Sequence, residues 1–243
     1  MGTDFINHVI IIGWDAFSAD VAKQLVNADR KVAVMTENKN DIDLIYQQFD
    51  QKELFVCFSD LSNYSSLKLL NAEKASVAFL NNGGDSDKLI SILNIKKLYP
   101  DLKFVVILEN SELKETFVNA GVTYVLSKNE IASKLLASYI FEPAVADFTQ
   151  DLLTSTNNEL EYDIQQYRVI ETNPYKDTSY GNMFFELKEK YNIIAIGLKK
   201  GNGQLKKVPD NNEKIEQGDD VVVIANGATE KVMQKLFKVY EGI

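Results

Sequence analysis

The sequence is poor in the residues from which many catalytic and metal-binding sites are built. Its 243 residues include one cysteine, Cys57, and one histidine, His8. A lone cysteine excludes an internal disulfide and is typical of a reducing compartment. Its place in the apolar run LFVCF predicts a small buried side chain. A lone histidine excludes a zinc site made of several histidines, and any triad that takes its histidine base from elsewhere in the chain.

Positive charge and long apolar runs are scarce as well. The chain has 26 Lys and Arg residues against 35 Asp and Glu residues, which gives a formal net charge of −9 at pH 7. This balance disfavours non-specific binding to nucleic acid or to anionic lipid. No apolar run approaches the roughly 20 residues of a membrane helix, and residues 1–7 lack the basic start and apolar core of a signal peptide. We expect no nucleic acid partner and no direct membrane insertion by this chain.

The motifs of common enzyme classes are also missing. The sequence has no nucleophile elbow, no phosphate-binding loop that ends in Gly-Lys-Ser/Thr and no pair of histidines at metal-ligand spacing. We expect His8 at the start of the first strand, away from the crevice at the carboxyl ends of the strands. Because no acid–base constellation remains, the sequence predicts a protein that is not an enzyme.

Six short runs in the first half of the chain are apolar on nearly every residue, which is typical of strands covered on both faces. They lie at 8–13, 31–36, 54–59, 76–81, 103–108 and 123–127. Amphipathic stretches of helical period separate them, including one at 65–72. We expect Ser18 and Ser111 to cap two helices and Gly121 to end one. The alternation predicts an α/β fold with a Rossmann-like, doubly wound parallel sheet.

The pattern changes after the sixth run. About 29 residues of helical character follow, interrupted at Pro143, so we expect two helices with a bend. Their apolar faces need cover from a partner subunit or, alternatively, from the first domain. A polar linker (157–161) then leads to a small α+β lobe with a hairpin that turns at GNG. We expect a Rossmann-like N-lobe at 1–128, crossover or dimerisation helices at 129–156, and a C-terminal lobe at 157–243.

The residues that follow the strands form the candidate site. In an open parallel sheet, ligands bind in the crevice beyond the carboxyl ends of the strands, where the strand order reverses. The residues expected to converge there follow the first five strands in turn: Gly13, Trp14 and Asp15, then Glu37, Asp60, Asn81 and Glu109.

The glycine fingerprint of dinucleotide-binding folds is incomplete here. Gly13 occupies its first position, but Asp15 and Ser18 stand at the second and third. Glu37, 24 residues after Gly13, suits an acid that bonds a ribose hydroxyl, although a solvated loop acid is the alternative. Asp15 adds bulk and negative charge where a pyrophosphate would approach, which lowers the affinity for phosphate. Alternatively, Asp15 simply stabilises the start of its own helix.

A hard cation is the second candidate ligand. Calcium takes six to eight oxygen ligands, and carboxylates suit it. The acids expected on this rim are Asp15, Glu37, Asp60, Asp85, Asp87 and Glu109. No compact loop motif fixes their spacing, so the metal-binding residues stay open, and a solvated acidic rim is the alternative.

Five stretches, taken in their order and spacing, carry a resemblance that covers nearly the whole chain. They are HVIIIGW with the helix after it, VAVMTEN with its terminal acid, SDLSNYSSLKLLNAEKASVAFLNN, NAGVTYVLS, and the segment 192–226 with Pro209 and Gly218-Asp219. Together they resemble the RCK domain (regulator of K⁺ conductance, KTN/TrkA-type) with its RCK-C lobe. The similarity is to the cytosolic gating-ring domains of prokaryotic calcium-gated K⁺ channels, with Ser59 in place of a usual glycine.

The resemblance implies a regulatory module. Such domains form homodimers through the connector helices, and the dimers assemble into an octameric ring on the cytosolic side of a K⁺ channel or K⁺ transporter. This implies a cytoplasmic location at the inner face of the cell membrane, with ligand binding in the inter-lobe cleft coupled to pore opening. Family ligands include NAD(H), ATP/ADP and Ca²⁺. The contacts implied for a nucleotide are Gly13, Trp14, Asp15, Glu37, Asp60, Asn81 and Glu109.

The chain departs from this family in two respects. The incomplete glycine motif disfavours a phosphate-rich ligand. The calcium-gated relatives carry acids after the fourth strand and around the fifth, whereas Asn81, Leu108, Glu109 and Asn110 leave one acid here, which disfavours the same calcium site. Two other function classes stay open: a nicotinamide-dependent oxidoreductase with the same first domain, and a structural assembly module with an empty cleft.

Overall fold

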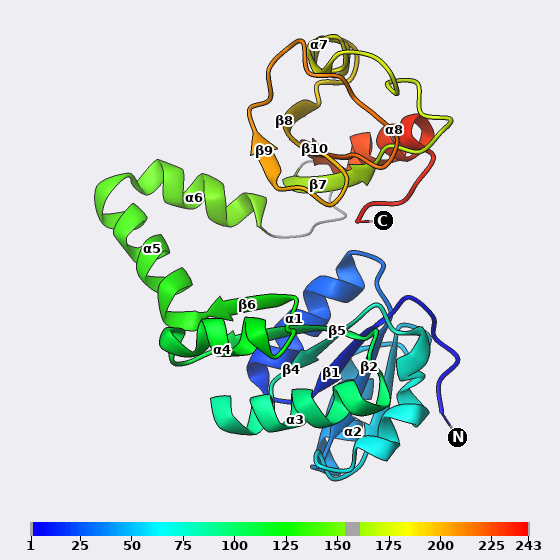
Figure 1. Ribbon diagram of the computed structural model, residues 1–243, viewed down its shortest axis with the longest axis vertical. Coiled ribbons are helices and arrows are strands. Elements are labelled where there is room, and N and C mark those ends of the chain that lie inside the picture. The colour runs from blue at the N-terminus through cyan, green and yellow to red at the C-terminus, as the bar shows by residue number, and fades with distance from the viewer. Residues whose placement is uncertain (1, 154–160, 243) are drawn as a thin grey trace. The chain divides into compact units, whose positions relative to one another are not determined.

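The computed structural model describes residues 2–153 and 161–242. The chain divides into two compact units, Met1–Pro143 and Ala144–Ile243. Figure 1 shows a parallel sheet flanked by helices in the first unit, and a smaller sheet with its own helices in the second. The division falls within the stretch 129–156, for which we expected connector helices.

The first unit is built on a sheet of six parallel strands. They are β1 (Val9–Ile12), β2 (Val32–Thr36), β3 (Leu54–Phe58), β4 (Val77–Leu80), β5 (Lys103–Leu108) and β6 (Tyr124–Ser127). The strand order is β3-β2-β1-β4-β5-β6, so the order reverses between β1 and β4. All strands pair in parallel, and the apolar side chains of β1 to β5 are largely buried. The edge strand β6 is not covered on both faces as expected, because Tyr124 and Leu126 are exposed. The predicted Rossmann-like, doubly wound sheet is confirmed.

Two hydrophobic cores, one on each face of this sheet, hold the strands in place. The flanking segments are α1 (Ala16–Asn27), α2 (Asn40–Gln48), α3 (Asp85–Leu98), α4 (Lys114–Asn119) and the 3₁₀ turns η1 (Tyr64–Leu70), η2 (Ala72–Lys74) and η3 (Ser111–Leu113). Successive strand residues point to opposite faces. Ile10 and Ile12 therefore join one core with Phe104, while Ile11 joins the other with Ala22.

The expected N-caps at Ser18 and Ser111 are wrong. Asp15 caps α1, because its carboxylate accepts a hydrogen bond from the Ser18 N–H (2.8 Å) and Ser18 lies within the first turn. Asn110 caps η3 in the same way, through the N–H of Glu112 (3.0 Å). In both places the short side chain just before the turn reaches an N–H that has no partner inside the helix.

The helix expected at 65–72 is also corrected. This stretch forms two short 3₁₀ pieces, with bonds such as the Ser66 N–H to the Asn63 carbonyl (3.0 Å), and a left-handed residue, Asn71 (φ 52°), separates them. The predicted helix end at Gly121 is confirmed: α4 stops just before it, and Gly121 has φ +83°.

Two helices follow the sheet, as predicted: α5 (Lys128–Phe141) and α6 (Pro143–Leu152). Pro143 is the first residue of α6, where its missing N–H leaves no intrahelical bond unmade. No side chain of α5 is buried in the described part of the chain, and Ile140 and Phe141 are 79% and 82% exposed. Most apolar side chains of α5 are therefore exposed, and Leu135 is half-buried.

The second unit is an antiparallel sheet with two helices and one core. Its elements are β7 (Tyr162–Arg168), α7 (Tyr180–Tyr191), β8 (Ile194–Lys199), β9 (Leu205–Lys207), β10 (Asp220–Asn226) and α8 (Gly227–Phe237). The strand order is β7-β10-β8-β9, and the hairpin β8–β9 turns at GNG as predicted. Tyr167, Met183 and Phe237 lie in the core. Most of the expected linker, 157–160, lies outside the described residues.

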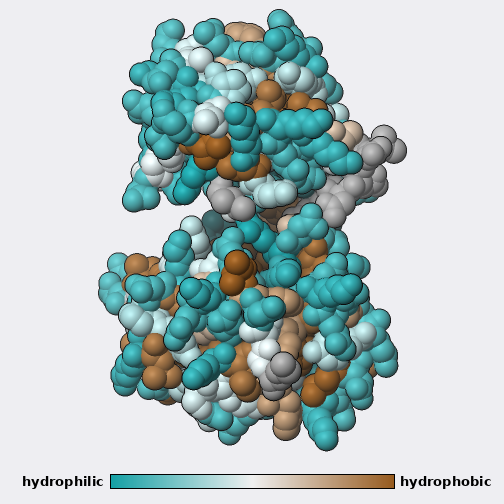
Figure 2. Space-filling model, turned by 90° about the vertical axis from the view of Figure 1, so that its right-hand side faces the viewer, coloured by the Kyte–Doolittle hydropathy of each residue, from teal (hydrophilic) through white to brown (hydrophobic). Residues whose placement is uncertain are grey.

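The surface is mainly polar. Figure 2 shows a face on which hydrophilic side chains prevail and apolar ones form separate patches. Across residues 2–153 and 161–242, no helix has both the length and the apolar character needed to cross a lipid bilayer.

Candidate ligand site at the carboxyl edge of the parallel sheet

The turn after β1 lies directly against the end of β4. Gly13 has φ +92°, and its N–H donates to the carbonyl of Met35 in β2 (2.9 Å). A Cβ on this residue would overlap the carbonyl oxygen of Asn81. Both the backbone angle and the space therefore require glycine at the first fingerprint position.

Asp15 belongs to a small hydrogen-bond network that joins this turn to the residue after β4. Its Oδ1 accepts from the Ser18 N–H (2.8 Å) and from Asn81 Nδ2 (2.7 Å). Asn81 Nδ2 also donates to Ser18 Oγ (2.8 Å), and that hydroxyl donates to the Gly13 carbonyl (3.1 Å). The structure thus shows the helix-start role that was one of the two interpretations of Asp15.

Beside this network lies a cavity of about 250 Å³, here called the first hollow. Its lining residues come from the ends of β1, β4 and β5 and from α1, α3 and α5: Asp15, Phe17, Asn81, Gly83, Lys88, Ile107, Leu108, Glu109 and Lys128. Asp15, Asn81 and Glu109 are residues that the sequence analysis placed in the site, and the structure brings them together here. The two lysines were not predicted.

Lys88 is the unusual member of the first hollow. It is 4% exposed, and its ammonium group donates to the Ile107 carbonyl (2.9 Å) and lies 3.8 Å from the Asp85 carboxylate. A buried ammonium is costly unless it is paired and hydrogen-bonded. Because Lys88 also lines a cavity at the carboxyl edge of the sheet, its ammonium group is a candidate contact for an anionic group of a ligand.

A second cavity of about 320 Å³, the second hollow, lies at the ends of β2, β3 and β4. It is lined by Glu37, Asp60, Leu61, Ser62, Tyr64, Asn82, Gly83, Asp87, Ile90 and Ser91. Glu37 and Asp60 from the predicted set meet here, apart from the other three. The side chains of Glu37 and Asp60 are exposed. Hydrogen bonds from Ser62, through its hydroxyl (2.6 Å) and its N–H (2.7 Å), lower the pKa of Asp60.

The second hollow also contains a buried acceptor without a partner. Asn82 is 9% exposed and donates from Nδ2 to Ser91 Oγ (2.9 Å), which also receives a bond from the Tyr64 hydroxyl (3.2 Å). The other end of the amide, Asn82 Oδ1, has no hydrogen-bond partner among the described residues. Because buried acceptors are nearly always paired, this oxygen suits a donor group on a ligand.

Three residues discussed in the sequence analysis, Trp14, Cys57 and His8, are packed or hydrogen-bonded within the fold. Trp14 packs edge-on against Phe49 (6.4 Å between ring centres) in one of the two cores. Cys57 is buried in β3, as predicted. His8 lies before β1, away from the carboxyl edge as predicted, and its Nε2 pairs with the Leu70 carbonyl (2.8 Å). Burial lowers the pKa of His8 more than this hydrogen bond raises it.

Comparison with known proteins agrees with this geometry. The family described as "TrkA-N domain" matches residues 9–128, from β1 to the first residue of α5, and so includes every candidate site residue. Residues 9–128 form a TrkA-N domain. The predicted resemblance to RCK domains of the KTN/TrkA type is thereby confirmed.

Proteins similar to this chain are named as ion channels. The "Calcium-gated potassium channel TvoK" of Thermoplasma volcanium is 26% identical over 231 residues, which cover 92% of this chain and 64% of that protein. The "Probable ion channel POLLUX" of Oryza sativa subsp. japonica is 22% identical over 98% of this chain and 26% of its own length. The chain thus spans less than two thirds of either relative.

A solved structure shares the fold. The human SLO3 gating ring superposes with a TM-score of 0.66 at 14% identity, over 94% of this chain and 46% of that one. At this identity the likeness concerns the fold, and it extends beyond the TrkA-N domain into the second unit.

The acids of the TrkA-N domain do not gather into one cation site. In the part of the chain that the structure describes, no three His, Cys, Asp or Glu side chains lie close enough to hold a metal ion. Asp85 accepts bonds from the N–H groups of Glu109 (3.2 Å) and Asn110 (2.9 Å), and Asp87 from that of Gly84 (3.0 Å). The expected rim is therefore divided, and some of its acids are already bonded to the backbone.

A signal for Lys88 was present in the sequence of the TrkA-N domain. The buried residues of α3 are Lys88, Ser91, Ile92 and Ile95, at positions i, i+3, i+4 and i+7. This spacing marks the inward face of a helix. A lysine on such a face, in the first turn of a helix that follows a strand, points towards the strand ends.

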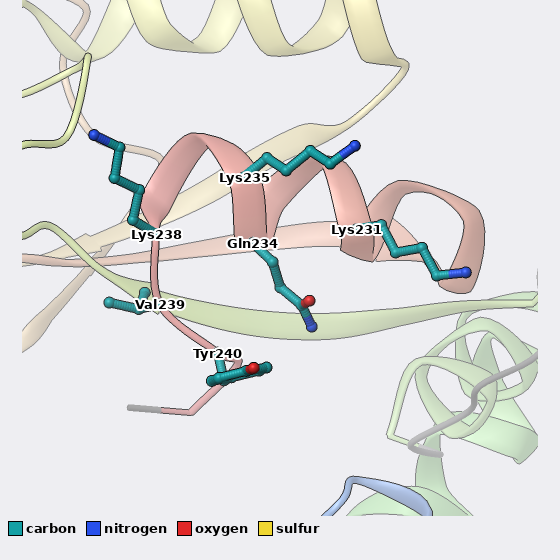
Figure 3. A pocket seen from close by; sticks show the side chains of 6 residues that line it. All are labelled: Lys231, Gln234, Lys235, Lys238, Val239 and Tyr240. Carbon is teal, nitrogen blue, oxygen red and sulfur yellow. The ribbon is translucent and has the colours of Figure 1, made fainter.

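A third cavity, of about 370 Å³, lies in the second unit along α8, and lysines line it. Figure 3 shows that the side chains of Lys235 and Lys238 point in opposite directions, while Lys231 extends away from both. Because the ammonium groups diverge, they do not form one anion site, and the TrkA-N edge remains the candidate.

Proposed function

We propose that this chain is a cytosolic ligand-sensing regulatory domain, a gating-ring component, of a K⁺ channel or K⁺ transporter. The observation that carries the proposal is the second hollow of the TrkA-N domain, where exposed acids after β2 and β3 meet the unpaired Asn82 Oδ1. The K⁺ channel name of the relative TvoK supports the transport role. Ligand binding at this edge would be coupled to pore opening, and the proposal assigns no catalysis to the chain.

We infer that the ligand is NAD or an adenine nucleotide. Both Glu37 and Asn82 line the second hollow. There Glu37 would accept bonds from ribose hydroxyls, and Asn82 Oδ1 would accept one from a hydroxyl or an exocyclic amine. Gly13 allows the close backbone approach at the switch point. Ca²⁺ is the second proposed ligand, supported by the name of TvoK, with its ligand residues left open.

Isothermal titration calorimetry with NAD⁺, ADP, ATP and Ca²⁺ tests this proposal. We expect binding of at least one nucleotide, and a loss of about tenfold or more in its affinity in Glu37→Ala, because a ribose loses its charged acceptor. Glu53→Ala, an exposed acid outside the hollow, is the matched control. No heat with any of the four would contradict the proposal and favour an assembly module with an empty cleft. Hydride transfer from NADH to a substrate panel would contradict the absence of catalysis.

We also propose that the chain forms homodimers that assemble into an octameric ring attached, through a membrane pore subunit, at the inner face of the cell membrane. The exposed apolar side chains of α5, Ile140 and Phe141 among them, support a partner surface there. Light scattering at tens of micromolar should show dimers or octamers, and a strict monomer is the opposing result.

A further inference from the structure

We propose that the first hollow is a phosphate-binding pocket, in which Lys88 and Lys128 hold the phosphate groups of a nucleotide whose nucleoside lies in the second hollow. This inference rests on the proposed function, since it assumes a nucleotide ligand. It differs from the phosphate position of the glycine fingerprint, which is the amino end of the first helix.

The phosphate position of the glycine fingerprint, the amino end of α1, is occupied by a side chain of this chain. The carboxylate of Asp15 already accepts the Ser18 N–H of α1, and Asn81 Nδ2 holds it there with a second bond of 2.7 Å. A phosphate at α1 would have to break both bonds and would also meet the charge of the aspartate. The phosphates of a ligand therefore need another cation.

Lys88 supplies that cation. Its ammonium carries three N–H groups, of which one donates to the Ile107 carbonyl (2.9 Å), and its nearest acid, Asp85, lies 3.8 Å away. Asp85 is itself shared, because its two oxygens accept the N–H groups of Glu109 and Asn110. The buried ammonium is thus only partly compensated, and an anion in the hollow completes its coordination.

The remaining charges of the hollow leave room for an anion. Asp15 also lines the hollow and keeps its charge, but its carboxylate is held at the start of α1 by bonds from the Ser18 N–H and Asn81 Nδ2. Glu109 is exposed at the rim and is free to turn towards solvent, whereas Lys128 lines the cavity from the start of α5. Lysine ammonium groups at close range bind phosphate strongly in a site partly shielded from water.

One residue joins the two hollows. Gly83 lines both, and a Cβ on it would overlap the side chain of Asp87. Its φ of +59° also favours glycine. The backbone between the hollows therefore carries no side chain, and one molecule can place its nucleoside on one side of Gly83 and its phosphates on the other.

Titration calorimetry on the full chain with adenosine, ADP, ATP and pyrophosphate tests this inference. In the wild type, ADP and ATP should bind about tenfold or more tightly than adenosine, with a preference that falls as salt is added. Lys88→Gln should remove this preference and leave the affinity for adenosine unchanged. Lys97→Gln, an exposed lysine on the same helix, is the control and should behave as wild type.

The outcomes separate the two proposals. If adenosine and ADP bind equally well, the phosphate pocket is overturned while the proposed function stands. If no nucleoside or nucleotide binds but pyrophosphate binds and Lys88→Gln weakens it, the pocket stands and the proposed ligand falls. If Lys88→Gln does not fold, as a thermal melt would show, Lys128→Gln carries the test with an expected loss of about threefold for ADP. No loss in Lys128→Gln would then overturn the pocket.

Discussion

The two hollows at the carboxyl edge of the parallel sheet differ in how their polar groups are used. In the first, the side chains of Asp15, Ser18 and Asn81 bond to one another across residues that are more than sixty positions apart. In the second, Glu37 and Asp60 are exposed, and the carboxylate of Asp60 accepts hydrogen bonds from its near neighbour Ser62. Long-range bonds stabilise the fold, whereas local bonds leave the acids available.

This difference indicates that the first hollow contributes to the stability of the fold, whereas the second hollow is available for a ligand. The bonds of the first hollow connect the turn after β1 to the end of β4, so changes there should affect the stability of the whole unit. The acids of the second hollow support no distant element, so changes there should affect ligands and local pKa values. The predictions below test this contrast.

The largest expected effect is at Gly13. Gly13→Ser should lower the free energy of unfolding by about 3 kcal/mol, because the residue has φ +92° and a Cβ would overlap the Asn81 carbonyl. Gly84→Ser is the matched control: Gly84 has φ −80° and caps α3, a position that serine suits, so its stability should stay within about 0.5 kcal/mol. Urea unfolding monitored by circular dichroism measures both. Equal losses of unfolding free energy in the two variants would show that the close contact between Gly13 and Asn81 is not specially important for stability.

A middle-sized effect is expected at Asp15. Asp15→Ala should cost about 1 kcal/mol of unfolding free energy, since α1 loses its cap and Asn81 loses an acceptor. Asp15→Asn keeps an oxygen at the cap and should cost less than about 0.5 kcal/mol. The same unfolding measurement compares them. An equal loss in Asp15→Asn and Asp15→Ala would show that the charge of Asp15, rather than its capping oxygen, stabilises this turn.

The smallest effect concerns the second hollow. In the folded protein the pKa of Asp60 is lowered, so its contribution to stability is present above the ordinary aspartate pKa and is lost as the pH falls through the folded value. Ser62→Ala should raise the pKa of Asp60 towards its ordinary value, which an NMR titration of the carboxyl carbon follows. Ser65→Ala is the control, because its hydroxyl bonds to Asn63 instead. An unchanged pKa in Ser62→Ala would mean that Ser62 does not hold Asp60.

The sheet was predictable because its signal is local. Each strand is an apolar run of four to six residues, and β1, with Ile10, Ile11 and Ile12 in succession, can only be covered on both faces. The end of α4 at Gly121 was predictable for the same reason, since a positive φ favours glycine within one turn of the chain.

The site was only partly predictable, because its contacts join distant residues. Strand-end logic named Asp15, Asn81 and Glu109 together, yet it could not separate them from Glu37 and Asp60, since the division depends on how α3 and Gly83 lie between the hollows. The sequence offered Ser18 as the cap of α1 and Asp15 as another residue that stabilises the start of this helix, because both residue types cap helices equally well. Only the backbone of the structure shows that α1 begins directly after Asp15, which makes Asp15 the cap.

The carboxylate of Asp15 has a consequence for selectivity. Because it is attached to the chain beside the amino end of α1, it acts as a permanent intramolecular competitor at high effective concentration. A free anion gains access to α1 only in the fraction of molecules where this carboxylate has swung away, and its apparent affinity is reduced by that fraction. We therefore expect the start of α1 to bind inorganic phosphate and other small anions weakly, and to bind a phosphate better when its ligand is also held elsewhere in the protein.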